Sequence, residues 1–533
     1  MPLMPGLRRA RSAPRLATVA LAACAVLGLV GLAACAPRAP SGPPAGAAAA
    51  AALAEAPPRP LPPRPWQDEV LYFVLVDRFA DGDRGNDQDV DLAGKGTFHG
   101  GDLRGLTAHL DDLAALGVTA IWVNPLVRNI PGYVSGAGFP DWAYHGYWMD
   151  DLSRLDPRFG SEADLAAFVN ACHARGIRVL LDVVYNHAGY DTAYLRDPRT
   201  RPWLRNNVVG DCGDDDLTSC LAGLPDWKTE LPEVREFLLA AQFGWAKRSG
   251  VDGFRLDTVK HVEPDFWALH RRRVRAELVP GFFLLGELWG GDRESLDPYF
   301  AADTLDAGLD FGFQGSTVGW LLGRGRTIAY ERYLASRHKV RPGHLLAHYL
   351  SSHDQPGALH LLGGDRALFR LAALLQLTTL GVPTIFYGEE VARPIGEWPD
   401  NRSDMPWGQM DVLPGAGKPR DEAMRAFYRR VIALRRAHPA LSRGTHEPVS
   451  TDGDGLAFLR RDGDDAVLVA VNRGKSPLSL RIPVPAGWEG RELEDALEGE
   501  AISVGAGGVA LELPGHGARV VVARPAPGAA IRR

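Results

Sequence analysis

The sequence predicts an α/β fold: a (β/α)8 TIM barrel with an excursion domain after its third strand, followed by a C-terminal antiparallel β-sandwich. Three observations lead to this fold. Short apolar runs alternate with amphipathic helical patterns across residues 66–435, polar residues gather where those runs end, and strand-and-turn patterns without helices occupy residues 440–525. Strand–helix alternation is typical of a parallel barrel, whereas short strands separated only by turns indicate a sandwich.

The barrel strands are predicted from eight apolar runs, at residues 70–79, 118–126, 177–187, 251–257, 282–288, 305–313, 345–354 and 382–390. The run at 305–313 is the weakest of them. Amphipathic segments such as 103–117 and 162–176 lie between the runs, and each is closed by a glycine that suits the end of a helix. Residues 188–230 are too long for an ordinary strand–helix loop, so we expect a small excursion domain there.

Residues 1–35 have the pattern of an export signal, because Arg8, Arg9, Arg11 and Arg15 precede a long apolar run. The run ends in "LAAC", which resembles a bacterial lipobox whose Cys35 is lipidated. Residues 36–65 are almost all Ala, Pro, Gly and Arg, a composition typical of a tether. We therefore expect an exported protein that is lipid-anchored through Cys35 at the outer membrane or cell surface. An uncleaved membrane helix is the alternative, because the run is long enough to span a bilayer.

The composition is that of a soluble globular protein, with 23% charged and 46% hydrophobic residues. A net charge of −6 and the lack of a basic stripe argue against nucleic acid as a partner. We expect a monomer. Cys212 and Cys220 flank an acidic loop, and in an oxidising compartment they are predicted to form a disulfide. Their spacing does not suit zinc, and Cys172 lies in an apolar helical pattern that predicts a buried thiol.

Three carboxylates end three of the predicted strands: Asp257, Glu287 and Asp354. Barrel active sites are built at this C-terminal rim. Arg255 lies two positions before Asp257, so both side chains share one face of the strand, and the arginine favours the ionised carboxylate. The hydrophobic neighbours of Glu287 favour its neutral form. A nucleophilic carboxylate and a proton donor flanking a glycosidic bond are the machinery of a glycosidase.

Five motifs resemble the α-amylase superfamily of retaining glycoside hydrolases (glycoside hydrolase family 13): "DVVYNH" (182–187), "GLPDW" (223–227), "GFRLDTVKH" (253–261), "GELW" (286–289) and "SSHD" (351–354). "AYHGYW" (143–148) is similar to the substrate-site segment of fungal-type α-amylases. The resemblance implies that Asp257 is the nucleophile, Glu287 the general acid/base and Asp354 the carboxylate that grips the sugar beside the cleavage point. The substrate contacts that it implies are Arg255, His187, His353, His145, Tyr147, Lys260 and His261, with the last pair of these, Lys260 and His261, on the leaving-group side.

Calcium is the expected cofactor, with two sites. Residues 77–87 and 99–102 are rich in oxygen ligands, which suit Ca²⁺, although composition alone predicts a solvated acidic turn equally well. This segment resembles the N-terminal calcium loop of cyclodextrin glucanotransferases, which implies the ligands Asp81, Asp83, Asn86, Asp87, the backbone of Gly100, and Asp102. A second site of the family maps onto Asn186, Asp226 and the carbonyl of His261, with Asp214, Asp215 or Asp216 as the remaining ligand.

The leading functional prediction is a retaining, endo-acting α-amylase that hydrolyses α-1,4 bonds of starch and maltodextrins. The segment "PDNRSDMPW" (399–407) resembles maltodextrin-hydrolysing relatives. A cyclomaltodextrinase- or glucanotransferase-like enzyme acting on maltooligosaccharides is therefore the alternative. Ser352 and Gly357 stand where the family usually has asparagine and arginine, which weakens a finer assignment. An inactive glucan-binding lipoprotein is the rival from another class, and the presence of both Asp257 and Glu287 argues against it.

Overall fold

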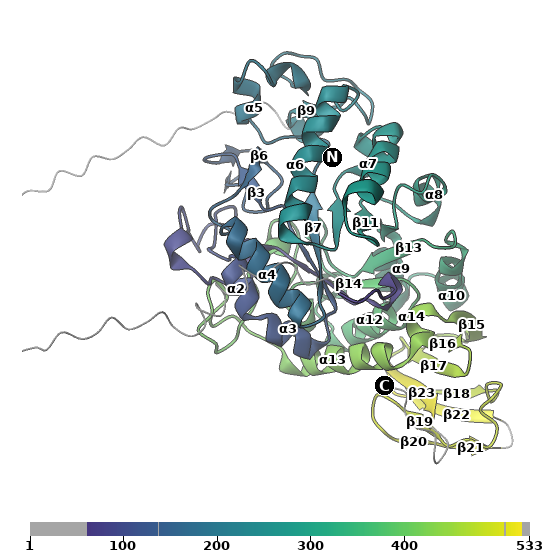
Figure 1. The fold of residues 1–533 in the computed structure, drawn as a ribbon. Helices are drawn as coiled ribbons and strands as arrows, with labels where there is room; N and C mark the ends of the chain where they lie inside the picture. The colour runs from purple at the N-terminus through teal and green to yellow at the C-terminus, as the bar shows by residue number, and fades with distance from the viewer. Residues whose placement is uncertain (1–60, 137, 506–507, 525–533) are drawn as a thin grey trace, which may run out of the picture.

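Eight parallel strands close into a barrel in the computed structural model, which describes residues 61–136, 138–505 and 508–524 (Figure 1). The strand order is β1-β14-β13-β12-β11-β10-β7-β2. The strands are β1 (Leu71–Val74), β2 (Ala120–Val123), β7 (Arg178–Val183), β10 (Gly253–Leu256), β11 (Phe283–Gly286), β12 (Ala307–Asp310), β13 (Leu345–Tyr349) and β14 (Val382–Phe386). Each lies within one of the eight predicted runs, including the weak run at 305–313, so the predicted barrel is confirmed.

Helices follow most of the barrel strands and cover the outside of the barrel (Figure 1). They are α2 (Leu103–Ala108), α3 (Leu110–Leu116), α4 (Glu162–Ala174), α6 (Pro232–Ser249), α7 (Pro264–Glu277), α8 (Arg293–Ala301), α9 (Gly312–Leu321), α10 (Thr327–Ser336), α12 (Arg366–Thr378) and α13 (Glu422–Ala437). The helical pattern at 103–117 forms two helices, because His109 leaves helical geometry between α2 and α3. Gly117 ends α3 in the left-handed conformation that its position predicted.

Two of the long excursions from the C-terminal rim contain short strands. The first follows β2 and was not predicted from the sequence. It contains β3 (Val127–Asn129), β4 (Val134–Ser135), β5 (Pro140–Asp141) and β6 (Met149–Leu155). The second follows β7 and contains α5 (Ala193–Arg196), β8 (Leu204–Arg205) and β9 (Asp226–Trp227). Strands β8 and β9 pair with each other, and a bridge between His187 and Asp226 ties this excursion to the barrel.

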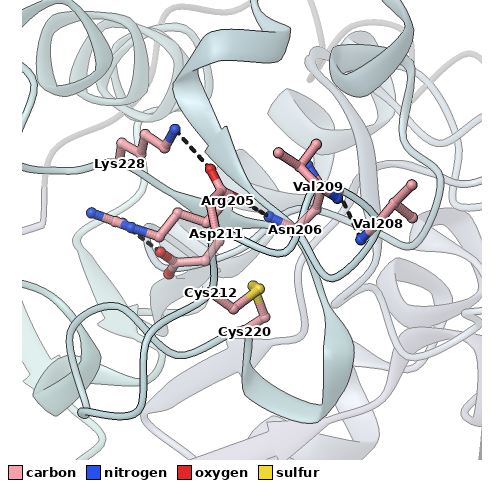
Figure 2. Close-up of a disulfide and its surroundings, with 9 residues drawn as sticks. Arg205, Asn206, Val208, Val209, Asp211, Cys212, Cys220 and Lys228 are labelled. Carbon is pink, nitrogen blue, oxygen red and sulfur yellow. Dashed lines mark hydrogen bonds and ion pairs between the residues drawn. A yellow bond between two sulfur atoms is a disulfide. The ribbon is translucent and has the colours of Figure 1, made fainter.

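A disulfide between Cys212 and Cys220 closes a loop within the second excursion, as the sequence predicted (Figure 2). The neighbouring turn is held by Asn206, whose side-chain oxygen accepts hydrogen bonds from the backbone of Val208 and Val209. Free Cys172 is buried.

The C-terminal strands form two antiparallel sheets, which confirms the predicted sandwich. One sheet has the order β15-β16-β17-β23-β19-β20 and the other β18-β22-β21. These strands are β15 (Thr445–Ser450), β16 (Gly455–Asp462), β17 (Asp465–Asn472), β18 (Leu478–Ile482), β19 (Leu493–Asp495), β20 (Ala501–Ile502), β21 (Val504–Gly505), β22 (Gly508–Leu513) and β23 (Gly517–Ala523). Leu468, Ile482 and Leu511 belong to the buried apolar cluster of this domain.

The predicted lipobox at Cys35 and most of the predicted tether lie outside the described residues. Among the described residues, no helix is both long enough and apolar enough to cross a membrane.

Candidate active site

Arg255 is the centre of a buried cluster of three carboxylates at the ends of β7, β10 and β11. Its Nη1 lies 2.5 Å from Asp257 Oδ1 and 3.1 Å from Asp182 Oδ1. Its Nη2 lies 2.7 Å from Glu287 Oε1. Buried charges are costly unless they are paired, and here one fully buried guanidinium lies against all three carboxyl groups. Asp257 and Glu287, the predicted nucleophile and proton donor, therefore contact the same arginine side chain.

Glu287 has the electrostatic surroundings of a proton donor. Burial raises the pKa of Glu287 most; Arg255 opposes this, the charges of Asp257 and Asp354 add to it, and the resulting pKa is about 8. The backbone N–H of Thr258 donates to Glu287 Oε2 over 3.2 Å. A carboxyl group that is still protonated at neutral pH can transfer its proton to a leaving group.

Asp354 follows β13 and is held by two neighbours. His353 Nε2 lies 3.1 Å from Asp354 Oδ2, and Arg402 Nη2 lies 3.1 Å from Asp354 Oδ1. Burial raises the pKa of Asp354, but the charges of His353, Arg402 and Arg255 outweigh it and the pKa is lowered. Burial also lowers the pKa of His353 itself to about 4. At neutral pH the arginines therefore supply the positive charge that keeps Asp354 ionised.

Arg402 had no role in the sequence interpretation. It lies in the turn η9 (Asp400–Arg402), and its Nε also donates to the carbonyl of His353 over 2.8 Å. A side chain at Gly357, where the family usually has arginine, has no room, because a Cβ there would lie 2.7 Å from Ile395 Cβ. Arg402 thus supplies a guanidinium to this carboxylate from a different loop, and no local pattern in the sequence indicates that contact.

Asp182 is the second residue whose role was missed. Its Oδ2 accepts hydrogen bonds from Tyr147 Oη (2.7 Å) and Trp122 Nε1 (3.0 Å), while its other oxygen faces Arg255. Burial raises the pKa of Asp182 to about 7, although Arg255 opposes the shift. The signal that could have found it is its place in the "DVVYNH" motif, since β7 pairs Asp182 directly with Arg255.

The predicted sugar-contacting residues His145 and Tyr147 reach the rim from the first excursion. Gly146 between them has φ of 92°, and a Cβ there would lie 2.1 Å from the carbonyl of Pro125, so only glycine fits this turn. The ring of Tyr147 stacks on that of His353 with centroids 5.3 Å apart. Burial lowers the pKa of His145, so its imidazole is neutral at pH 7 and can take part in hydrogen bonds with sugar hydroxyls.

His187, Lys260 and His261 lie where the second excursion meets the barrel. Lys260 and His261 form the turn η6 (Val259–His261) after β10. His261 Nδ1 donates to the carbonyl of Asp216 over 2.7 Å, and Lys260 Nζ lies 3.5 Å from Asp216 Oδ1. The loop closed by the disulfide therefore touches both predicted leaving-group residues. Burial lowers the pKa of His187, which is neutral at pH 7.

Comparison with known proteins settles the family. A family model for the α-amylase catalytic domain matches residues 73–208 and 216–427, and one for the maltogenic amylase C-terminal domain matches residues 449–520. The chain belongs to the α-amylase family of glycoside hydrolases. A protein named cyclomaltodextrinase from Bacillus sp. is 32% identical over 79% of this chain and 75% of its own length. The periplasmic α-amylase of Escherichia coli is 33% identical over 76% of this chain and 72% of its own.

Solved α-amylase family structures share the fold. The crystal structure of an α-amylase from Geobacillus thermoleovorans complexed with acarbose has a TM-score of 0.76 and 29% identity, covering 87% of this chain and 100% of that one. A cyclomaltodextrinase structure has a TM-score of 0.73 and 29% identity, covering 86% of this chain and 78% of that one.

The loop before α2 carries the first set of calcium ligands that the family resemblance implies. Asp81 Oδ1, Asn86 Oδ1 and Asp87 Oδ1 are buried without a hydrogen-bond partner. Burial raises the pKa of Asp81 and Asp87, and nearby aspartates raise it further. A Cβ on Gly100 would lie 2.7 Å from Asp87 Oδ1, so the backbone at Gly100 closely approaches this carboxylate. Unpartnered oxygens beside mutually repelling carboxylates fit a hard divalent cation.

Two of the predicted ligands in this loop are also engaged by protein groups. Asp83 Oδ2 pairs with Arg104 over 2.6 Å, and its Oδ1 accepts from the backbone of Gly85. Asp102 Oδ2 accepts from the backbone N–H of Asp83 over 2.8 Å. Over the described ranges, no group of three or more His, Cys, Asp or Glu side chains is arranged to hold a metal ion. A site here thus depends on Asn86 and the Gly100 backbone as well as on carboxylates.

The second predicted site brings three acceptors together. The side-chain oxygen of Asn186 faces the carbonyl oxygen of His261 at 2.9 Å and Asp226 Oδ1 at 3.3 Å. A cation bound between these three oxygens would remove their mutual repulsion. Rotation of the Asn186 amide removes it equally well, because the NH2 group then donates to the His261 carbonyl and to Asp226 Oδ1. Asp226 Oδ2 accepts from Arg205 over 2.7 Å. Of the three candidates for the remaining ligand, Asp216 lies against His261, while Asp215 Oδ1 accepts from backbone N–H groups of its own loop.

Proposed function

We propose that this protein hydrolyses α-1,4 bonds of maltooligosaccharides and cyclodextrins with retention of configuration, as a cyclomaltodextrinase-like enzyme. The proposal rests on one observation: Asp257 and Glu287, whose raised pKa keeps it protonated at neutral pH, both contact the guanidinium of Arg255. Relatives named cyclomaltodextrinase, neopullulanase and maltogenic α-amylase, which are 27–32% identical, support this substrate range over the endo-acting alternative.

The proposed reaction has two displacements. Asp257 attacks the anomeric carbon while Glu287 gives its proton to the departing glycosidic oxygen, which leaves a glycosyl ester on Asp257 and an ionised Glu287. Glu287 then takes a proton from water, and the resulting hydroxide equivalent displaces Asp257 from the same carbon. Asp354, held ionised by Arg402, hydrogen-bonds the sugar at the cleavage point. Arg255 balances the negative charge that moves between Asp257 and Glu287.

An endo-acting α-amylase is the second candidate, because the E. coli periplasmic α-amylase and the G. thermoleovorans α-amylase are about as similar to this chain. Product analysis on β-cyclodextrin, amylose, maltoheptaose and pullulan separates the two. Ring opening of β-cyclodextrin faster than amylose cleavage supports the first proposal. Rapid loss of amylose chain length with intact β-cyclodextrin supports the second. Products longer than the substrate indicate glucosyl transfer. No cleavage of any α-glucan in the presence of Ca²⁺ contradicts both and leaves a glucan-binding lipoprotein.

We propose in addition that Ca²⁺ stabilises the rim. The residues that fit it best are Asp81, Asn86, Asp87, the carbonyl of Gly100, and Asp102, with a second ion at Asn186, Asp226 and the carbonyl of His261. Ca²⁺ supplies positive charge to these oxygens and takes no part in the bond-breaking steps. Export, lipid anchoring at Cys35 and a monomeric state are also proposals, which rest on the sequence.

A further inference from the structure

A pocket of about 120 Å³ lies at the end of the barrel opposite to the candidate active site. Its lining includes Arg337, His338, Arg341 and His344, from the segment that precedes β13, and Gly381, just before β14. Segments that precede parallel strands lie at the N-terminal end of a barrel, whereas the catalytic carboxylates follow their strands. A cavity needs only about 10–15 Å³ to hold a water molecule, so this pocket has room for a small polyatomic ligand.

The charged lining of the pocket is basic, and within the described residues none of its lining side chains is acidic. Arg337 is buried; its Nε donates to the carbonyl of Leu380 over 2.9 Å, and its Nη1 pairs with Asp310. A Cβ on Gly381 would lie 3.1 Å from Arg337 Nη2. Because Asp310 balances the charge of Arg337, any excess of positive charge here comes from other residues.

Two further buried arginines supply that excess. Arg435 Nη2 donates to the carbonyl of Gly381 over 2.6 Å, and Arg460 Nη1 donates to the carbonyl of Thr378 over 2.7 Å. In the part of the chain that the structure describes, neither guanidinium forms an ion pair with a carboxylate. Thr378 ends α12, and a helix C-terminus carries only about half a negative charge. Two guanidiniums exceed that half charge, so the wall of the pocket beside Gly381 is electropositive.

His338 lies in the turn η7 (Arg337–Lys339) and is affected by this positive charge. Burial lowers the pKa of His338 most, and the charges of Arg460 and Arg337 lower it further, to about 4. The imidazole is therefore neutral at pH 7 and has one N–H to donate. The ring of His446 on β15 lies 6.3 Å from that of His338, so the pocket adjoins the junction between the barrel and the sandwich (Figure 1).

The other two basic side chains of the pocket differ in their freedom to bind a ligand. His344 Nδ1 contacts the carbonyl of Leu305 over 2.9 Å, and its ring stacks on Phe300, so this side chain forms a fixed wall. Arg341 pairs with Asp297 over 3.0 Å, but both side chains are more than 40% exposed. Such surface pairs contribute little to stability, so Arg341 can turn from Asp297 to an anion in the pocket at small cost.

We propose that this pocket binds a phosphate group, either as inorganic phosphate or as a small phosphate monoester, with His338 and Arg341 as its direct donors. A guanidinium matches the oxygens of a phosphate with two parallel hydrogen bonds, and the arginines behind Gly381 add positive charge. The anion lies beside the junction of the barrel and the sandwich. It binds the folded state, so it stabilises the protein by linkage and takes no part in the reaction at the other end of the barrel.

Isothermal titration calorimetry with inorganic phosphate and with glycerol 3-phosphate tests the proposal, with sodium chloride keeping the ionic strength constant. We expect saturable binding with one site per chain, and a Kd about tenfold higher in Arg341→Gln, as for the loss of one charge-assisted hydrogen bond. His338→Ala should weaken binding as well. Lys339→Gln is the matched control, because Lys339 is an exposed cation of the same turn that does not line the pocket. It should bind like the wild type.

The two probes distinguish the sources of the phosphate group. Tighter binding of glycerol 3-phosphate supports a monoester as the ligand, and tighter binding of inorganic phosphate supports the free ion. A melting temperature that rises with the tighter probe, but not with sodium chloride at equal ionic strength, supports the same site. Saturable binding of neither probe overturns the proposal. An equal loss of affinity in Lys339→Gln and Arg341→Gln also overturns it, because the effect is then one of overall charge. No α-glucan is used, so the outcome is independent of the proposed function.

Discussion

Arg255 Nη1 lies 2.5 Å from Asp257 Oδ1, with both side chains buried on the same face of the polypeptide as β10 reaches the rim. Their spacing of two residues lets a single strand deliver the carboxylate together with the cation that balances it. The same guanidinium extends to Glu287 on the neighbouring strand. The reacting groups are therefore positioned relative to each other by the barrel itself and do not depend on a mobile loop.

Replacement of either reacting carboxyl should remove most turnover without unfolding the protein. We expect Asp257→Asn and Glu287→Gln each to lower kcat for maltoheptaose about 10²–10⁴-fold or more. A substrate with an activated leaving group needs no acid, so 2,4-dinitrophenyl α-glucoside should partly restore glycosyl-enzyme formation in Glu287→Gln but not in Asp257→Asn. Near wild-type turnover of maltoheptaose by either variant contradicts the assignment. Proton NMR of the first product should show the α-anomer.

The pKa of about 8 for Glu287 predicts the alkaline limb of the activity profile. The donor must be protonated, so kcat/KM for maltoheptaose should fall as pH rises through about 8. The same raised pKa means that the neutral carboxyl of Glu287 favours the folded state. This contribution to stability is complete below the unfolded pKa of 4.5 and is lost as pH rises through about 8. The melting temperature of Glu287→Gln minus that of wild type should therefore increase from pH 5 to pH 8. A difference that does not change with pH contradicts the raised pKa.

Arg402 should lower the pKa of Asp354 and hold its carboxylate in place. Arg402→Ala removes its contacts with the Asp354 carboxylate and the His353 carbonyl, so we expect kcat/KM to fall at least about tenfold, as for the loss of a buried charge pair. The pKa of Asp354 should rise without this cation, which moves the acidic limb of the profile to higher pH. Arg402→Lys should reverse much of that shift. A lower rate with an unchanged acidic limb indicates a purely structural role.

Calcium removal should destabilise the protein if the loop before α2 binds the ion. A ligand present at about 100 times its Kd adds about 2.7 kcal/mol to the free energy of unfolding. Calorimetry with EDTA and with Ca²⁺ should show a higher melting temperature with the ion. Asp87→Asn should reduce this difference, and Asp89→Asn, in the same loop but outside the predicted ligand set, should preserve it. Equal melting of the apo protein and the Ca²⁺-loaded protein removes calcium from the proposal.

Cys35→Ala tests the proposed lipid anchor. A diacylated cysteine holds a protein on a membrane in proportion to its buried methylenes, so the variant should either leave active enzyme in the soluble fraction or accumulate as an unprocessed precursor. Cell fractionation with an activity assay measures this. Mature variant that still sediments with membranes indicates an uncleaved helix instead.

The sequence by itself determined the barrel, the sandwich and the identity of the candidate catalytic carboxylates. These features depend on short-range patterns: apolar runs of strand length, glycines that end helices, and the two-residue spacing that places Arg255 beside Asp257. The disulfide between Cys212 and Cys220 was also readable, because the two cysteines are only eight positions apart. Such patterns are local because hydrogen bonding and side-chain direction within one element repeat over a few residues.

Only the tertiary structure decided which distant loops complete the site. Arg402 reaches Asp354 across 48 positions. The rings of Phe139 and Trp398 have centroids 5.3 Å apart, although the two residues come from loops after β2 and β14. Closure of the barrel brings these loops together, because β1 lies between β2 and β14 in the ring. No periodicity connects their sequences. The contacts around the carboxylates are therefore set by the geometry of the closed barrel, whereas the carboxylates themselves are set by the strands that carry them.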